Sequence, residues 1–271
     1  MNFVSLADLT EHDVRAIWAM ADEPHAALTG NVAWSFEGNG IRTRTTFIRA
    51  FQELGLPFTE LPNLLKTSER VVDLAGYLDP FYDLYVIREA DHQRLKDFAA
   101  CSVRPVINAM SAFGHPCEVL TDAYYLNKRF QSIERAHICL WGPPTNVFRS
   151  WHELAGVLGF CLTHVCETQH HETNPFVHFQ CDAPPRADVV ITDAWPSEGG
   201  NSSFALTPQQ LDAMGTPALL PTPPFTIGRE LLFDPVGYPG FVGYQQKQHL
   251  LTVQKAILRY ALKQPTARHT P

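Results

Sequence analysis

The sequence predicts an α/β fold with two lobes, each a parallel sheet covered by helices, on three observations. At 271 residues the chain exceeds the roughly 150 residues that are typical of one domain. Short apolar runs, such as 138–141 and 189–192, alternate with stretches of helical periodicity, such as 151–158. This alternation is typical of parallel strands connected by helices. Apolar residues make up 45% of the chain, which is enough for a sizeable core.

The first elements follow from local patterns. Thr10 precedes a stretch in which Val14, Ile17 and Trp18 recur at helical spacing, so we expect a helix that is N-capped by Thr10. Residues 32–36 form a short apolar run that ends before a glycine-containing turn, after which apolar residues again recur at helical spacing. This order predicts a strand, a glycine turn and a helix.

The remaining elements set the expected domain boundaries. Further strands are expected at 84–87, 105–107, 138–141 and 189–192, and helices at 151–158 and 246–262. Residues 120–135 resemble a long helix that leads from one lobe to the next, which places the boundary near residue 130. We therefore expect a first lobe of residues 1–130 with the return of helix 246–262, a second lobe of residues 131–245, and a tail of residues 264–271.

Charge and hydropathy exclude several classes of partner. The formal charge is −7, with 28 acidic against 21 basic residues, so no net attraction to nucleic acid or to an anionic membrane is expected. No run approaches the ~20 apolar residues of a membrane span, and the N-terminus lacks the pattern of a signal peptide, which favours a cytoplasmic protein. The six cysteines form no C-x-x-C pair and are expected to be reduced core thiols.

The strongest motif is the junction at residues 36–47. A strand–turn–helix junction directs backbone N–H groups and the positive end of a helix dipole at any bound anion. Arg42 and Thr43 add donors there. One alternative is an amphipathic helix with a basic first turn. A dinucleotide-binding loop fits less well, because Thr43 stands where the third glycine or alanine is needed.

The motifs together resemble the aspartate/ornithine carbamoyltransferase family. Residues 36–44 are similar to its Phe-Glu…Ser-Thr-Arg-Thr-Arg signature, residues 115–122 to its His-Pro-x-Gln-x-Leu-x-Asp segment, and Arg88 to the strand-end arginine between them. Residues 142–150 resemble its Gly-Asp-x-x-Asn-Val-x-x-Ser stretch, and residues 187–197 the Ala-Asp-Val-x-x-Thr-Asp-x-Trp-x-Ser of the ornithine branch. The matches keep their order through almost the whole chain. The resemblance implies two Rossmann-like lobes and is closer to the ornithine branch.

The resemblance also implies roles for single residues. Arg42, Thr43 and the amides of the turn would hold the phosphate of carbamoyl phosphate, Arg88 would bridge the phosphate and the carbonyl oxygen, and His115 would donate to that oxygen. Arg42, Arg88 and His115 are thus the expected catalytic residues. The full expected carbamoyl phosphate-binding set is Gly40, Ile41, Arg42, Thr43, Arg88, His115 and Glu118, and the acceptor-binding set is Asn146, Asp193, Ser197, Leu219 and Leu220.

The implied partners are two small molecules, carbamoyl phosphate and an amine acceptor, with no metal and no organic cofactor. A homotrimer is also implied, because residues 66–69 fall where the family's mobile loop reaches into a neighbouring subunit. The match of these four residues is loose, so a solvated charged loop is the preferred interpretation. Histidines and cysteines are dense in residues 164–181, but no spacing there matches a recognised zinc module.

Several residues depart from the family pattern. Gly40 and Ile41 replace Ser-Thr, which removes two hydroxyl donors, and Glu118 replaces glutamine. Leu250 stands in place of an arginine of the last helix, and residues 218–221 replace His-Cys-Leu-Pro. A standard ornithine enzyme is therefore not expected. Two alternatives stay open, namely a diverged enzyme with a different anionic substrate and a non-catalytic paralogue; a nicotinamide dehydrogenase ranks last.

Overall fold

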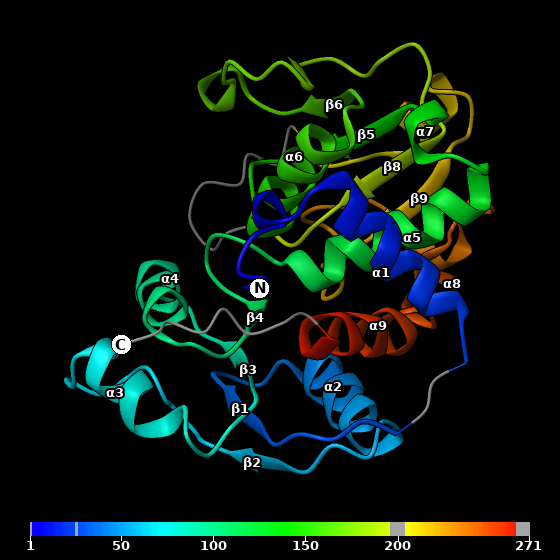
Figure 1. The fold of residues 1–271 in the computed structure, drawn as a ribbon. Coiled ribbons are helices and arrows are strands. Elements are labelled where there is room, and N and C mark those ends of the chain that lie inside the picture. The colour runs from blue at the N-terminus through cyan, green and yellow to red at the C-terminus, as the bar shows by residue number, and fades with distance from the viewer. Residues whose placement is uncertain (1, 25–26, 196–203, 264–271) are drawn as a thin grey trace. The chain divides into compact units, whose positions relative to one another are not determined.

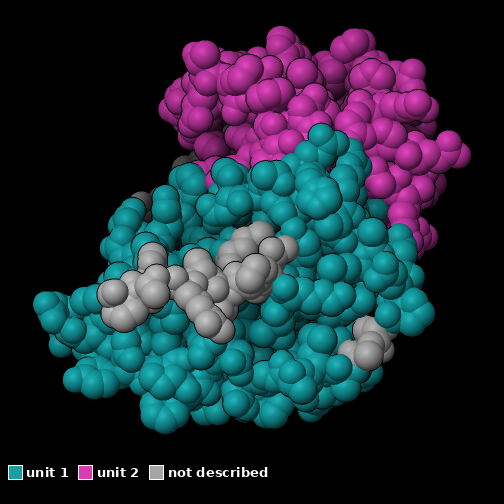
Figure 2. All heavy atoms as spheres, viewed as in Figure 1, with its two compact units in different colours: residues 1–124, 249–271 teal, residues 125–248 magenta. Residues whose placement is uncertain are grey.

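The computed structural model describes residues 2–24, 27–195 and 204–263. The chain divides into two compact units, residues 1–124 with 249–271 and residues 125–248, which Figure 2 shows in two colours. We expected the boundary near residue 130 and the return at residue 246. Ser197 and the expected tail at 264–271 lie outside the described residues.

Unit 1 contains a four-stranded parallel sheet in the order β2-β1-β3-β4 (Figure 1). Its strands are β1 (Val32–Phe36), β2 (Phe58–Glu60), β3 (Leu84–Arg88) and β4 (Val106–Met110). Its helices are the 3-10 helix η1 (Leu6–Asp8) and α1 (Glu11–Asp22), α2 (Ile41–Glu53), α3 (Val71–Leu78), α4 (His92–Cys101) and α9 (Leu250–Lys263), and α5 (Pro116–Phe130) runs from this unit into the next.

Both faces of this sheet are buried, as side-chain alternation along a strand requires. Trp34 of β1 lies on one face, where its ring centroid is 5.6 Å from that of Phe47 and 5.7 Å from that of Phe51, both on α2. The neighbouring Ala33 belongs to a different cluster, on the other face, that also contains buried residues of α3 and α4. The last helix, α9, packs against α1 and α2 (Figure 1).

Unit 2 contains a five-stranded parallel sheet in the order β7-β6-β5-β8-β9. Its strands are β5 (Ile138–Trp141), β6 (Leu162–Val165), β7 (Val177–Gln180), β8 (Val189–Thr192) and β9 (Ala218–Pro221). Its helices are α6 (Asn146–Leu158), α7 (Pro208–Ala213) and α8 (Gly243–Lys247), with 3-10 turns η2 (Ile133–Arg135), η3 (Thr168–His170) and η5 (Pro235–Gly237).

The connections of unit 2 are uneven. The crossover from β5 to β6 is the amphipathic helix α6, which buries Trp151 and Leu154. The crossover from β6 to β7 contains only the single turn η3, and the connection from β7 to β8 contains no helix, both within described residues. Parallel strands are usually joined by a helix. Helix α6 nevertheless contacts both strands, because the ring centroid of His152 lies 5.1 Å from that of His164 on β6 and 5.5 Å from that of Phe179 on β7.

The predicted fold class is confirmed, and three strands have the predicted bounds, at 32–36, 138–141 and 189–192. Thr10 caps α1 as expected, because its hydroxyl accepts from the backbone N–H of Asp13 at 3.2 Å. Among the described residues, no helix is both long and apolar enough to span a membrane.

Two expected helices are wrong in their extent. The helix expected at 120–135 ends at Phe130, because Gln131 adopts a left-handed backbone with φ of 63°, which a continuing α-helix does not allow. The helix expected at 246–262 is two helices, α8 and α9, separated at 248–249. The six cysteines are free, but only Cys117, Cys139 and Cys166 are buried, so the expectation of core thiols is wrong for Cys101, Cys161 and Cys181.

Candidate functional site

The N-terminus of α2 is the predicted anion site, and its local structure suits an anion. Gly40 is the N-cap, so the helix has no side-chain cap, and its first turn contains no acidic residue. The first N–H groups of a helix lack partners within the helix, and together with the dipole they make this end positive. No carboxylate of the first turn neutralises the positive end of α2.

Arg88 lies directly against this turn. It is the last residue of β3 and pairs in register with Phe36, the last residue of β1. A Cβ atom added at Gly40 would lie 2.5 Å from Arg88 Nη1 and 2.5 Å from Phe36 Cζ. Only glycine fits there without a shift of these groups. The structure therefore brings Gly40 and Arg88, two of the predicted residues, into contact.

The guanidinium of Arg88 contacts an aromatic ring and lies close to a second cation. Its guanidinium carbon lies 5.0 Å from the ring centroid of Phe36, a distance typical of cation–π contact. Burial lowers the pKa of Arg88, Glu37 opposes that effect, and the charge of Arg42 lowers the pKa further. Arg42 is thus close enough for its charge to act on Arg88.

The two other predicted residues of this turn differ in exposure. Thr43 is buried, with 6% of its surface exposed, whereas Ile41 is 74% exposed. An exposed isoleucine beside two cations is not explained by core packing. It is the feature of this turn that fits a phosphate site least well.

A partly buried ion-pair network lies next to the arginine. Glu37 accepts from the backbone N–H of Ala90 at 2.7 Å, and this bond is the largest cause that lowers its pKa. Lys66 Nζ lies 3.2 Å from Glu37 Oε1 and 2.5 Å from Glu89 Oε1, and Glu89 is only 2% exposed. Residues 66–69 are all exposed, as expected for a solvated charged loop, and the Lys66 side chain also links this segment to the residues that follow β1 and β3.

His115 and Glu118 come from the connection after β4. Arg88 of β3 pairs with Met110 of β4, and His115 follows five residues later, where its carbonyl accepts from the N–H of Val119 in the first turn of α5. Glu118 lies in the same turn and is 6% exposed. The binding roles of both stay predictions.

Unit 2 brings together two predicted acceptor residues at the carboxyl ends of its strands. Asp193 directly follows β8, and Asn146 begins α6 shortly after β5, which pairs with β8 through Trp141 and Thr192. Thr145, the N-cap of α6, is hydrogen-bonded through its side chain to Asp193.

The environment of Asp193 alters its acidity. Burial raises the pKa of Asp193 to about 6, and the nearby charge of Glu230 acts in the same direction. Hydrogen bonds from Thr145 and from the backbone of Ala194 lower the pKa and oppose this effect. The carboxylate is therefore largely ionised at neutral pH and is neutralised by mild acid.

Three supporting residues were not predicted from the sequence. The ring of Phe36 contacts the guanidinium of Arg88, and the side chain of Thr145 is hydrogen-bonded to Asp193. Glu230 accepts from the backbone N–H groups of Trp195 and Thr226 at 3.0 and 2.7 Å. A threonine just before a helical pattern is a recognisable cap, so Thr145 had a usable signal. Glu230 had none, because its partners are distant in sequence or in an irregular loop.

The leucines of the acceptor set lie in the interior. Leu219 is fully buried in a cluster with Leu211 and Met214 of the α7 region, and Leu220 is 1% exposed. Core packing is the role that the structure shows for Leu219, while acceptor binding stays a prediction for both. Leu250, the first residue of α9, is also buried.

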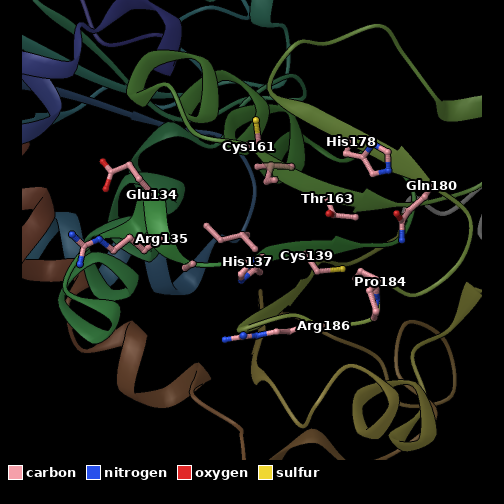
Figure 3. Close-up of a pocket in the computed structure, with 14 residues that line it drawn as sticks. Glu134, Arg135, His137, Cys139, Cys161, Thr163, His178, Gln180, Pro184 and Arg186 are labelled. Atoms are coloured by element: carbon pink, nitrogen blue, oxygen red, sulfur yellow. The ribbon is translucent and has the colours of Figure 1, made fainter.

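A separate pocket lies on unit 2 (Figure 3). It has a volume of about 510 Å³ and is lined by the amino ends of β5 and β6 and by residues such as Arg135, His137, His178 and Arg186. None of the predicted site residues lines it. Across residues 2–24, 27–195 and 204–263, no group of three or more His, Cys, Asp or Glu side chains is arranged to hold a metal ion.

Comparison with known proteins supports both units. A family model for the aspartate/ornithine carbamoyltransferase, carbamoyl-P binding domain, matches residues 1–128. The ornithine carbamoyltransferase of Halorhodospira halophila is 27% identical over 295 residues, covering 96% of this chain and 98% of the relative. That of Chlorobaculum tepidum is 28% identical over 255 residues, covering 84% and 75%.

Solved structures agree. The anabolic ornithine carbamoyltransferase of Campylobacter jejuni has a TM-score of 0.85 at 26% identity, covering 97% of this chain and 99% of that one. The ornithine carbamoyltransferase of Thermus thermophilus has a TM-score of 0.88 at 22% identity, with the same coverage, and shows the fold alone. Motifs, fold and relatives agree: residues 1–128 match the aspartate/ornithine carbamoyltransferase, carbamoyl-P binding domain, and the chain as a whole is similar to ornithine carbamoyltransferases.

Proposed function

We propose that this protein transfers a carbamoyl group from carbamoyl phosphate to an amine of a small amino-acid-like acceptor and releases phosphate. The observation that carries the proposal is the contact of Arg88 with Gly40 at the uncapped, positive end of α2, with Arg42 close by. Two cations at a helix N-terminus repel each other and the dipole. A bound dianion would attract both cations and the helix N-terminus, and this attraction would offset the repulsion among them.

The chemistry assigns a role to each residue. The neutral amine attacks the carbonyl carbon, the carbon–oxygen bond to phosphate breaks, and the proton lost by the nitrogen ends on the leaving phosphate. Negative charge develops on the carbonyl oxygen and on the leaving phosphate. Arg42, Thr43 and the first amides of α2 would bind the phosphate, Arg88 would contact both developing charges, and His115 would donate to the carbonyl oxygen.

The acceptor side is proposed from unit 2. A buried carboxylate such as Asp193 binds an ammonium group strongly once ionised, and the side-chain amide of Asn146 can bind a carboxylate. This pair suits an α-amino acid group. The relatives are named for ornithine, but residues 218–221 read Ala-Leu-Leu-Pro, with a buried Leu219 at the cysteine position. We therefore propose an acceptor other than ornithine.

One observation favours a second candidate. Ile41 is 74% exposed in the first turn of α2 and offers no hydrogen bond, in place of a hydroxyl residue. An anionic substrate with an apolar part near this turn would use that surface. A diverged enzyme of the same fold, acting on such a substrate, is the alternative to carbamoyl phosphate.

The test is formation of ureido product from carbamoyl phosphate across a panel of monoamino and diamino acids. Arg42→Ala is expected to abolish most activity. Arg49→Ala is the matched control, because Arg49 lies on the same helix, has a side chain that is 62% exposed, and pairs with Glu53 at 2.9 Å. Calorimetry with carbamoyl phosphate and with inorganic phosphate runs alongside.

The outcomes separate the proposals. Product with any acceptor supports carbamoyl transfer and identifies the acceptor. Binding of phosphate without binding of carbamoyl phosphate would favour the alternative substrate. Absence of product together with absence of heat from either ligand would overturn both and favour a non-catalytic paralogue.

We also propose a homotrimer that works in the cytoplasm. The support is the position of residues 66–69 in the family pattern and the absence of a membrane-spanning helix among the described residues. Light scattering coupled to size-exclusion chromatography measures the mass of the assembly directly. A monomeric mass at micromolar concentration would contradict the trimer.

A further inference from the structure

Two cysteines follow the edge strand β7 and its neighbour β6 at equivalent positions. β6 and β7 are parallel, and their last paired residues are Val165 and Gln180. Cys166 and Cys181 come next in the two strands. The backbone N–H of Cys166 donates to the carbonyl of Gln180 at 3.0 Å, so the hydrogen-bonded ladder continues to this point. The two cysteines thus occupy the next positions of the ladder.

This placement suits a disulfide. Neighbouring strands are about 4.8 Å apart, within the range of about 4.4–6.8 Å between the Cα atoms of a disulfide. Side chains alternate along a strand, so the cysteines share a face with the preceding pair, His164 and Phe179. The rings of that pair have centroids 5.4 Å apart, which shows that side chains of this register and face meet.

The two thiols have different surroundings. Cys181 is exposed, and its Sγ lies 3.2 Å from the hydroxyl of Thr168 and 3.9 Å from Nε2 of His171. The same Nε2 is 3.1 Å from the carbonyl oxygen of Cys166, which can only accept, so this nitrogen carries a proton. A hydrogen-bond donor therefore lies beside the exposed sulfur of Cys181.

Cys166 suits the role of the second thiol, which attacks an oxidised cysteine to form a disulfide. It is 1% exposed, and burial raises the pKa of its thiol to about 12, with the charge of Cys181 as a further cause. An oxidant in solution therefore meets Cys181 first, while Cys166 stays protonated and protected. One accessible thiol beside one protected partner is the usual arrangement of a redox-sensitive pair.

We propose that Cys166 and Cys181 form a reversible disulfide in response to hydroperoxides. The Cys181 sulfur attacks a peroxide oxygen, the S–O bond forms, the O–O bond breaks, and one water (from hydrogen peroxide) leaves. The Cys166 sulfur then attacks the Cys181 sulfur, the S–S bond forms, the S–O bond breaks, and its oxygen leaves as water with the Cys166 proton. Two thiols are oxidised and one peroxide is reduced, and a dithiol reductant reverses the step.

The disulfide would close the connection from β6 to β7. It would link the ends of β6 and β7 across η3, the single turn that joins them. The inference stands independently of the substrate proposed above, because it rests only on residues 162–181.

The experiment treats the full-length reduced protein with hydrogen peroxide and records the intact mass and the non-reduced peptide map. We expect loss of two hydrogen atoms, a peptide that joins Cys166 to Cys181, and full return with a dithiol. Retention of both thiols while Cys101 or Cys161 becomes oxidised would overturn the proposal. A link of Cys181 to any other cysteine would do the same.

Variants assign the two roles. In Cys166→Ala, Cys181 should accumulate as a sulfenic acid that a cyclic 1,3-diketone traps, and in Cys181→Ser the mass loss should disappear. Cys161→Ser is the matched control, since it removes an exposed thiol of the same unit and should leave the disulfide intact. His171→Asn should slow the oxidation of Cys181 toward the rate of Cys161. Equal rates for these two thiols in the unmodified protein would contradict activation by His171.

Discussion

The donor region of unit 1, at the start of α2, and the acceptor region of unit 2, around Asp193, differ in how the charge of their side chains depends on pH. At the start of α2, Arg42 and Arg88 add positive charge to an already positive helix end, and arginine stays charged at every physiological pH. In unit 2 the charge of Asp193 is weakened by burial, which raises its pKa to about 6. The contacts of Arg42 and Arg88 with a donor anion should therefore be insensitive to pH, whereas binding of a cationic acceptor at Asp193 should respond to mild acid.

The two regions also differ in the contacts that support their charged side chains. Asp193 is supported by Thr145, an ordinary helix cap that serves a second purpose. Arg88 is supported by Gly40 and Phe36 in a close contact that a Cβ atom would break. Glycine in place of serine at position 40 therefore removes a hydroxyl and also makes space for the guanidinium of Arg88.

The largest effect is expected from the donor arginine. Arg88→Ala should lower kcat/KM for carbamoyl phosphate by about 10²–10³-fold, since it removes a charged contact to both developing negative charges. Arg88→Lys keeps the charge but loses the planar fork and should recover only part of the rate. Steady-state assays of ureido product measure both. A loss below tenfold in Arg88→Ala would remove Arg88 from the catalytic set.

The next effect tests the contact at the turn. Gly40→Ser restores the hydroxyl of the family signature, yet we expect kcat/KM to fall by roughly tenfold to a hundredfold. The added Cβ would meet Arg88 Nη1 at 2.5 Å and would displace the guanidinium, and small misplacements of catalytic groups have effects of this size. Gly38→Ser is a matched control for a backbone change in the same turn without a nearby clash, although its positive φ makes it mildly destabilising. A gain of affinity for carbamoyl phosphate in Gly40→Ser would contradict this account.

The acceptor carboxylate provides the pH test. Below pH about 6 Asp193 takes up a proton and becomes neutral, so kcat/KM for an amino acid acceptor should fall as the pH drops through this value, about tenfold per pH unit well below it. Thr145→Val removes a hydrogen bond that lowers the pKa of Asp193. The decline of kcat/KM in acid should then occur at a pH that is roughly half to one unit higher. Pre-steady-state or steady-state pH profiles measure the shift. If kcat/KM of the variant declined at the same pH as in the parent protein, Thr145 would not influence the pKa of Asp193.

The same pKa has a consequence for stability. The folded carboxyl of Asp193 binds its proton more tightly than an unfolded one, so its contribution to the free energy of unfolding declines as pH rises from about 4 to about 6. Asp193→Asn should therefore unfold at a higher denaturant concentration than the parent protein at pH 8, with little difference at pH 4. Equal midpoints at both pH values would mean that burial does not strain this group.

The smallest effect is expected from the ring beneath the arginine. Phe36→Leu keeps an apolar side chain but removes the cation–π contact of Arg88, which is worth about 0.5–1 kcal/mol at such sites. Affinity for carbamoyl phosphate should fall by roughly twofold to fivefold, as calorimetry can show. An unchanged affinity would leave Gly40 alone as the support of Arg88.

The sequence by itself determined the fold class, the resemblance to carbamoyltransferases and several elements at residue precision. The strand at 138–141 and the cap at Thr10 were correct because their signals are local: an apolar run between polar turns, and a hydroxyl placed before helical spacing. Family motifs similarly identified Arg88 and Asp193 as candidates. These features depend on residues that are neighbours in the chain.

Tertiary structure decided what lies between distant segments. Only the pairing of β1 with β3 showed that Gly40 makes space for Arg88, and only the pairing of β6 with β7 placed Cys166 beside Cys181. The burial that raises the pKa of Asp193 is also a sum over many packed neighbours. The physical reason is the same in each case. Steric fit, side-chain pairing and desolvation depend on atoms brought together by the sheet register, which no local pattern in the chain encodes.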